Sequence, residues 1–256
     1  MDAPDAAPKT NTFGVIAAGA GFGIAAVTGI AALLAGLGTR WGWWDYRTGF
    51  LILTCAVWGG LAAAIISLYA MAIALRNRLR RAIVFGIHGL IIGALVFGVP
   101  WYLVHEGRKL PPIHDITTDT EDPPVFVAVL PLRKDAPNTA QYAGAELAAQ
   151  QKKGYPELAP AMLPVPPRAA FELALEVARR SGWAIVAAVP DDNRIEATAT
   201  TDWFGFKDDI VIRIRPAGGG SRVDMRSVSR VGRSDLGANA RRIREFLHQL
   251  TAGKTG

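Results

Sequence analysis

The chain has 256 residues, of which half are hydrophobic, and its net charge is +6. The charge is uneven: up to Lys109 nine Lys and Arg residues stand against four Asp and Glu residues, and the remainder carries nineteen against eighteen. The basic excess therefore accompanies the apolar half, where positive charge usually sets membrane orientation, and it argues against a nucleic-acid partner. The single cysteine, Cys55, excludes an intrachain disulfide framework and a thiolate metal centre.

Three apolar stretches are long enough to cross the hydrocarbon core of a bilayer, which takes about 20 helical residues. None of the three contains Asp, Glu, Lys or Arg. We therefore predict a three-helix transmembrane region within residues 12–109, preceded by a short cytoplasmic tail at residues 1–11. The predicted helices cover residues 13–38, 50–75 and 82–104.

Small residues recur at helical spacing within two of these stretches. Gly19 and Gly23 are four positions apart, as are Gly89 and Gly93. In lipid, small residues at this spacing let two helix backbones approach closely. We expect both pairs to lie at helix contacts.

The two short loops between the spans differ in charge. The loop "RNRLRR" at residues 76–81 has four arginines, whereas "TRWGWWDYRTG" has two arginines, one aspartate and four aromatic residues suited to a membrane interface. Cytoplasmic loops are enriched in Lys and Arg. We therefore predict a multi-pass protein of the inner membrane with its amino terminus in the cytoplasm and its carboxyl-terminal domain outside, although Arg108 and Lys109 oppose this assignment.

The second half begins with a proline-rich, acidic linker at residues 110–166, in which residues 138–154 have the composition of a short helix. Residues 167–256 then show the patterns of a small α+β domain. We predict a four-stranded antiparallel sheet with two helices on one face and a wet, charged surface on the other. The last helix begins at Ser234 or Asp235, with Leu236 as its first packed residue. The predicted strands cover residues 183–189, 194–201, 209–215 and 222–230, between helices at 167–182 and 234–250.

Several strings in this half resemble a known family. They are "HDITTDTEDPP", "YP", "FGFKDDIVIRIRP" and "SRVDMRSVSRVGRSDLGANARRIREFL", and the resemblance covers residues 113–250. They resemble the bacterial and plastid family catalogued as domain of unknown function 1499. The resemblance implies a small envelope protein, in some members with membrane spans ahead of the domain, and it implies no established activity.

An arginine-rich stretch, "SRVGRSDLGANARRIREF", joins the last predicted strand to the last helix. Its arginines and the free amides of the helix start could bind a phosphate or carboxylate, because Arg supplies forked donors and helix amino termini favour anions. Alternatively, the acids of the linker, including Glu121 and Asp122, could dock on these arginines and clamp the linker to the domain. The candidate residues for an anion site or a clamp are Arg226, Arg230, Arg233, Asp235, Asn239, Asp115 and Asp119.

A catalytic interpretation rests on acid and base residue types. His114 lies beside Asp115, and Lys207, Asp208 and Asp209 follow one another on a predicted strand. Two aspartates brought together could share a proton. However, the sequence has no nucleophile elbow and no HExxH zinc motif.

The preferred hypothesis is accordingly a membrane-anchored envelope module that binds or supports other molecules without catalysis of its own. The alternative is an envelope hydrolase that uses His114 and carboxylates of the linker or of the predicted strands. We expect no cofactor and no metal. The expected partners are the lipid bilayer and either an envelope protein or an anionic ligand, with no nucleic acid, and the oligomeric state stays open.

Overall fold

The structure is a computed structural model that describes residues 12–252. It divides into two compact units. One consists of the chain up to Val104 together with Trp203–Gly205, and the other of His105–Asp202 and the chain from Phe206 onward. The cytoplasmic tail predicted at residues 1–11 lies outside the described residues.

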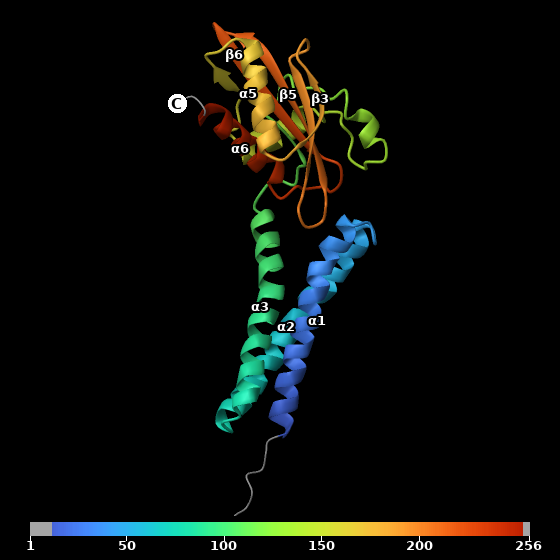
Figure 1. The fold of residues 1–256 in the computed structure, drawn as a ribbon, viewed down its shortest axis with the longest axis vertical. Helices are drawn as coiled ribbons and strands as arrows, with labels where there is room; N and C mark the ends of the chain where they lie inside the picture. The colour runs from blue at the N-terminus through green and yellow to red at the C-terminus, as the bar shows by residue number, and fades with distance from the viewer. Residues whose placement is uncertain (1–11, 253–256) are drawn as a thin grey trace, which may run out of the picture. The chain divides into compact units, whose positions relative to one another are not determined.

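Three long apolar helices make up nearly all of the first unit (Figure 1). Their most apolar 18-residue windows have mean hydropathies of 2.0 to 2.4, so each is long and apolar enough to cross a membrane. The second helix starts where the carboxylate of Asp45 accepts hydrogen bonds from the backbone N–H groups of Arg47 and Thr48, which satisfies donors that a helix start leaves free. The helices are α1 (Thr12–Arg40), α2 (Tyr46–Arg76) and α3 (Arg80–Gly107).

Glycine permits the closest approach between α2 and α3. A Cβ atom at Gly93 would lie 2.6 Å from the carbonyl oxygen of Gly60, so no larger residue fits at this crossing without a shift of the backbone. Gly89, one turn earlier, is in similarly close contact. The prediction for the other pair is wrong: a Cβ at Gly19 or Gly23 would meet nothing within 4 Å, because these two glycines face away from the other helices.

The second unit contains a single antiparallel sheet of six strands in the described residues. The four predicted strands are present as β3 (Ala184–Val189), β4 (Arg194–Thr200), β5 (Lys207–Ala217) and β6 (Gly220–Ser229), in the spatial order β6-β5-β4-β3. The predicted number of strands is therefore too low. Two further strands lie in the predicted linker, β1 (Asp115–Thr117) and β2 (Ala161–Leu163), and both pair with β6.

β1 and β2 were not predicted because the sequence of the linker contains no strand pattern. Each has only three residues and lies near prolines, so neither contains an alternation of polar and apolar residues that a pattern can reveal. Their extended conformation is imposed by pairing with β6, a long strand that β1 and β2 contact at different positions. Long-range pairing thus outweighs the local composition.

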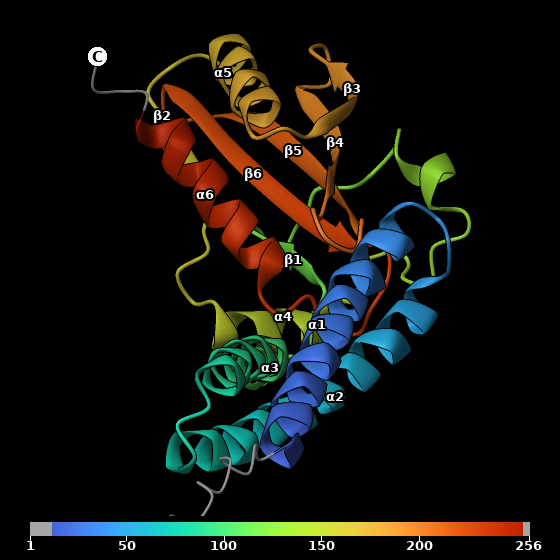
Figure 2. The same cartoon turned by 60° about the horizontal axis from the view of Figure 1, so that its bottom comes forward.

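Helices α5 (Pro167–Arg180) and α6 (Ala238–Ala252) cover one face of the sheet (Figure 2). The final helix starts later than predicted because Leu236 and Gly237 have positive φ angles of 50° and 79°, which a right-handed helix does not allow. Leu236 is exposed rather than packed on the sheet, so that prediction is wrong. Between the helices and the sheet lies the main core, which includes Phe171, Leu175, Ile195, Ile210, Ile212, Val223, Met225, Ile243 and Phe246.

The opposite face of the sheet is covered by residues 118–143, which we call the strap. The strap runs from β1 to α4 (Ala145–Gly154) and contains a short 3-10 helix, η1 (Leu130–Arg133). Phe126 and Val129 of the strap pack against sheet residues Val211 and Val228. The helix predicted at 138–154 is shorter at its start because residues 138–143 belong to the strap and α4 begins only at Ala145.

The predicted wet, charged face is therefore wrong. Glu196, Asp224 and Arg226 point to the strap side of the sheet, and each is at most 1% exposed. The pattern correctly showed charged residues on that face, but it could not show that the strap supplies partners that allow them to be buried. These buried charges are the starting point for the site.

Candidate functional site

Arg226, in the middle of β6, is the largest fully buried side chain of the described residues. Its Nε and Nη2 atoms donate to the two carboxylate oxygens of Asp115 at 2.9 and 2.7 Å. The same guanidinium donates to the carbonyl oxygens of Pro124 and Ala140 in the strap. The chain itself therefore provides the anion for Arg226, and the forked geometry of the pair is the one that Arg is suited to form.

Two aromatic rings of the strap enclose the same guanidinium. Its central carbon lies 5.2 Å from the ring centroid of Phe126 and 5.3 Å from that of Tyr142, within the range of cation–π attraction. Burial, together with the nearby charge of Asp115, raises the pKa of Tyr142 to about 12. The Tyr142 hydroxyl, buried and without a hydrogen-bond partner among the described residues, thus remains neutral at physiological pH.

Arg230 has an anion partner within the sheet. Its Nε and Nη2 atoms donate to Asp209 on β5, both at 2.8 Å, and Arg133 of the strap donates to the same carboxylate at 2.7 Å. Burial alone would raise the pKa of Asp209, but hydrogen bonds from Arg230, Thr198 and Arg133 lower it below its ordinary value. Here the strap contributes the cation rather than the acid.

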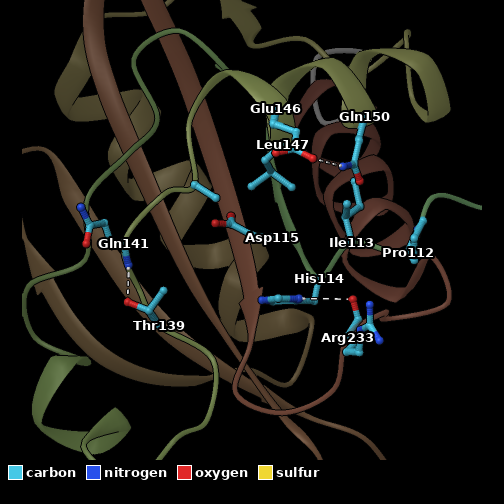
Figure 3. A pocket seen from close by; sticks show the side chains of 11 residues that line it. Pro112, Ile113, His114, Asp115, Thr139, Gln141, Glu146, Leu147, Gln150 and Arg233 are labelled. Carbon is cyan, nitrogen blue, oxygen red and sulfur yellow. Dashed lines mark hydrogen bonds between the residues drawn. The ribbon is translucent and has the colours of Figure 1, made fainter.

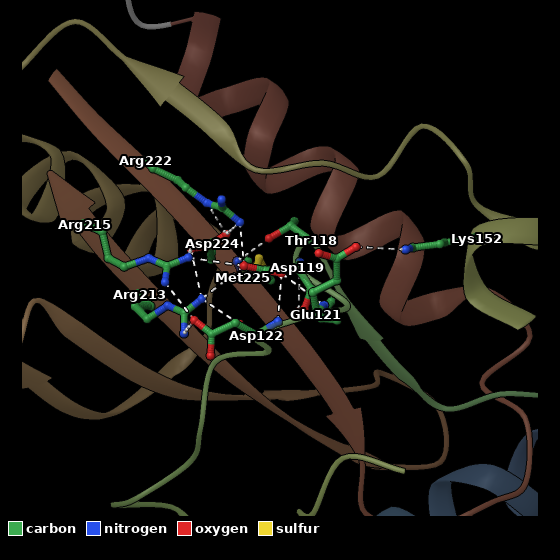
Figure 4. Close-up of polar contacts among 11 residues, drawn as sticks. Thr118, Asp119, Glu121, Asp122, Lys152, Arg213, Arg215, Arg222, Asp224 and Met225 are labelled. Atoms are coloured by element: carbon green, nitrogen blue, oxygen red, sulfur yellow. Dashed lines mark hydrogen bonds and ion pairs between the residues drawn. The ribbon is translucent and has the colours of Figure 1, made fainter. Parts of the chain in front are cut away.

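Among the acids considered for the clamp, Asp115 pairs with Arg226, one of the arginines considered with it, whereas the acids of the strap meet other arginines. Figure 4 shows Asp119 and Asp122 beside arginines that project from β5 and β6, with Asp224 of β6 between them. Burial opposes ionisation of Asp119, but backbone N–H groups of Asp122 and Glu121 and the neighbouring guanidinium groups hold its pKa below the ordinary value. The arginines of this cluster are Arg213, Arg215 and Arg222.

Glu196 is a further anchor of the strap, and sequence patterns do not predict this role. Its carboxylate, on β4, accepts hydrogen bonds from the consecutive backbone N–H groups of Val127, Ala128 and Val129 at 2.9–3.1 Å. Arg194 forms an ion pair with it. In the sequence, a glutamate at a polar position of an alternating strand cannot be told from a solvent-exposed residue. No local signal marks Glu196 as the hydrogen-bond acceptor for a segment 67 residues away.

Asp235 acts at the start of α6. Its carboxylate accepts hydrogen bonds from the backbone N–H groups of Gly237 and Asn239 at 2.9 and 2.7 Å. Burial raises the pKa of Asp235, and the nearby charge of Asp208 adds to this effect. The residue predicted to cap the helix therefore satisfies its free amides, although the regular helix begins only at Ala238.

Asn239 joins the same helix to the sheet. Its Oδ1 atom accepts a hydrogen bond from the Ser227 hydroxyl at 2.7 Å, and its Nδ2 atom donates to the Ser229 hydroxyl and to the carbonyl oxygen of His114. Arg242 donates to Ser227 and Asn239 as well. These polar side chains are occupied by one another, so Asp235 and Asn239 have a structural role in the observed geometry.

A cavity of about 360 Å³ lies where the end of the strap passes β1 and α4. Figure 3 shows His114 and Arg233 at one end and Glu146 and Gln150 at the other. The His114 Nδ1 atom lies 3.4 Å from the carbonyl oxygen of Arg233. We call this cavity the His114 pocket. Its lining residues are Pro112, Ile113, His114, Asp115, Thr139, Gln141, Ala143, Glu146, Leu147, Gln150 and Arg233.

The charges in the His114 pocket are less fully paired than those under the strap. Arg233 is exposed and forms no ion pair within residues 12–252, whereas Arg226 and Arg230 each have a carboxylate partner. Glu146 accepts only a long hydrogen bond of 3.5 Å from Gln150 among the described side chains. The pocket therefore offers a cation beside an imidazole at one end and polar groups at the other.

The structure does not bring the other acid and base candidates to this pocket. His114 and Asp115 line it, but Asp115 is committed to Arg226. Asp208 pairs with Arg242 at 2.6 Å, Asp209 lies under the strap, and neither they nor Lys207 line the pocket. In the described part of the chain no group of three His, Cys, Asp or Glu residues is placed to hold a metal.

The chain has a match among protein-family models. None of the curated proteins matches the chain. A family model described as "Protein of unknown function (DUF1499)" matches residues 115–250, which is more than half of the chain. The matched region begins at the first residue of β1 and includes the strap, so most of the segment that resembled a linker lies within the region that the family model matches. The chain therefore belongs to the DUF1499 family.

Proposed function

We propose that the protein is a membrane-anchored binding module of the cell envelope that holds a small ligand with an anionic group in the His114 pocket and has no catalysis of its own. The three apolar helices support membrane anchorage. The four arginines of the loop at residues 76–81 favour an extracytoplasmic position for the second unit. The His114 pocket then lies on the outer side of the inner membrane.

Arg233, which has no ion pair in the part of the chain that the structure describes, carries this proposal. Beneath the strap, arginines and carboxylates neutralise one another, so those groups have little to offer a ligand. Arg233, by contrast, lies beside His114 in a cavity whose volume falls within the range of about 300–1,000 Å³ for small-molecule sites. An anionic group there gains the charge-assisted hydrogen bonds that Arg233 lacks within residues 12–252.

Binding is preferred to hydrolysis because no carboxylate orients the His114 imidazole in the pocket. The His114 ring contacts a main-chain carbonyl oxygen, and the carboxylate next to it in the sequence, Asp115, is turned to Arg226. A general base in a hydrolase is normally oriented by such a carboxylate and lies within reach of a nucleophile. The hydrolase alternative therefore has no specific geometric support.

A titration of the full-length protein in lipid nanodiscs tests the proposal. Inorganic phosphate and acetate serve as probes, and the signals are the histidine imidazole resonances by NMR, with His114 assigned through a His114→Gln variant. We expect one of the probes to shift the His114 resonance, and Arg233→Ala to weaken that binding at least about tenfold, because a hydrogen bond to a charged group contributes roughly 1.5–3 kcal/mol.

Arg241→Ala is the matched control, because Arg241 is also exposed and without an ion pair in the described residues but does not line the pocket. This variant should bind as the unaltered protein does. An absence of any shift at His114, or equal weakening by both substitutions, would refute an anion site in this pocket.

A further inference from the structure

The outer side of the strap carries large apolar side chains in contact with solvent. Four of them occur within eight residues, and they are 45–69% exposed. Single exposed apolar residues are ordinary, but a group of them on one segment indicates an interaction surface. We call this group the strap patch. Its members are Val125, Val127, Leu130 and Leu132.

The side chains of the strap patch cannot be buried by a rotation of the strap toward the sheet. Phe126 and Val129, which alternate with it along the chain, already fill the inner side of the strap against the sheet. The backbone at residues 127–129 is held by the buried Glu196 carboxylate, and Arg133 at the end of η1 is held by Asp209. The patch is therefore a fixed feature of the surface rather than a loose segment that happens to point outward.

The chain itself indicates what covers the patch. Three of its helices are suited to a bilayer, and α3 ends at Gly107 while β1 begins at Asp115. The seven residues between them extend at most about 25 Å. The bilayer is therefore an apolar environment that always remains within reach of the strap. Because the domain is tethered to it, the bilayer acts as a partner at high effective concentration.

The charge next to the patch fits the same surface. Lys134 directly follows η1 and is exposed beside Asp135, and Arg108 and Lys109 in the connection after α3 are exposed, Lys109 in an ion pair with Glu106. Lysine and arginine side chains place their charged ends among lipid phosphates while their stems contact apolar groups. We propose that the strap patch docks on the bilayer that holds α1, α2 and α3, with its Val and Leu side chains at the boundary between headgroups and acyl chains. This contact is independent of the His114 pocket.

Site-directed spin labelling of the full-length protein tests the contact. In a Cys55→Ala background, a nitroxide is attached at Leu130→Cys, and the protein is reconstituted in vesicles of phosphatidylethanolamine and phosphatidylglycerol. Met162→Cys on β2 is the control, because Met162 is also an exposed apolar residue (55%, against 45% for Leu130) but lies outside the strap. We expect the label at position 130 to collide more with oxygen and less with a water-soluble nickel chelate than the label at position 162.

Replacement of Val125, Val127 and Leu132 with serine should raise nickel accessibility at position 130 to the level of the control, because the neighbouring side chains no longer hold the segment in the bilayer. Equal nickel accessibility at both positions in the unsubstituted background would overturn the proposal. Dipolar broadening between labels at position 130 would also overturn it, since it would show a second copy of the chain on the patch. Thermal unfolding of each variant checks that the domain remains folded.

Discussion

A carboxylate placed beneath the strap stays ionised only if its partners outweigh the cost of removing its charge from water. Asp209 illustrates the balance, because it is fully buried and receives hydrogen bonds from Arg133, Arg230 and Thr198. The net result is a pKa below the ordinary value. Removing one partner of such a buried group typically costs about 3–5 kcal/mol, since the remaining charge is left without compensation.

The lowered pKa of Asp209 predicts an acid-sensitive domain. As the pH falls, the unfolded state takes up the proton first, so the stabilisation from Asp209 is complete above the ordinary carboxyl pKa of about 3.9 and is lost as the pH approaches the lower native value. Asp209→Asn should reduce the unfolding free energy by about 3–5 kcal/mol at pH 7 and show a shallower decline between pH 5 and 3. Urea-dependent pulse proteolysis of the detergent-solubilised protein measures both quantities.

Glu172→Gln provides the comparison for this measurement, because Glu172 and its partner Arg168 are both more than half exposed. An exposed pair contributes at most about 1 kcal/mol. If Asp209→Asn and Glu172→Gln changed stability and its pH dependence equally, the buried cluster would have no special role.

The strap is the element that sequence patterns could not place. The long spans follow from uninterrupted apolar runs and β3 to β6 from the alternation of polar and apolar residues; both are local properties, and the structure contains these elements. The presence of acids in residues 113–122 and of arginines on the sheet was equally visible. Their individual pairing was not: Asp119 contacts Arg213 and Arg222 rather than one of the arginines considered for the clamp, and such choices depend on the register of β6 against β1.

The anchoring of the strap by Glu196 can be tested by hydrogen exchange. Glu196→Ala removes the acceptor of the backbone N–H groups at residues 127–129, so their exchange should accelerate at least about tenfold, as expected for the loss of hydrogen bonds to a charged group. Mass spectrometry of a peptide covering residues 125–133 measures the change, with a peptide from α6 as the internal reference. Glu176→Ala, at an exposed ion pair on α5, should leave the strap peptide unchanged. Unchanged exchange in Glu196→Ala would mean that other contacts hold the strap.

At the scale of the whole molecule, the charged loop between α2 and α3 determines the predicted orientation. A phosphatase reporter that requires the extracytoplasmic side, fused after Gly256, should be active. Replacing the four arginines at 76, 78, 80 and 81 with glutamine should lower that activity and produce a fraction of inverted chains, because the positive loop then no longer holds the cytoplasmic side. Glutamine at Arg179 and Arg180 of α5 should have no effect. If a reporter that fluoresces only in the cytoplasm were fluorescent when fused after Gly256 of the unaltered protein, the predicted orientation would be reversed.

The pairing of β1 with β6 also determines when the second unit can fold. Asp115, the first residue of β1, pairs with Val228 near the end of β6. β1 therefore cannot pair until β6, which lies more than a hundred residues later in the sequence, has been synthesised. Contacts of such long sequence separation form slowly. Because the amino-terminal part of a chain is made first, the three apolar helices leave the ribosome well before the sheet can close. The membrane segments therefore complete their synthesis while the unit that follows them is still an open chain.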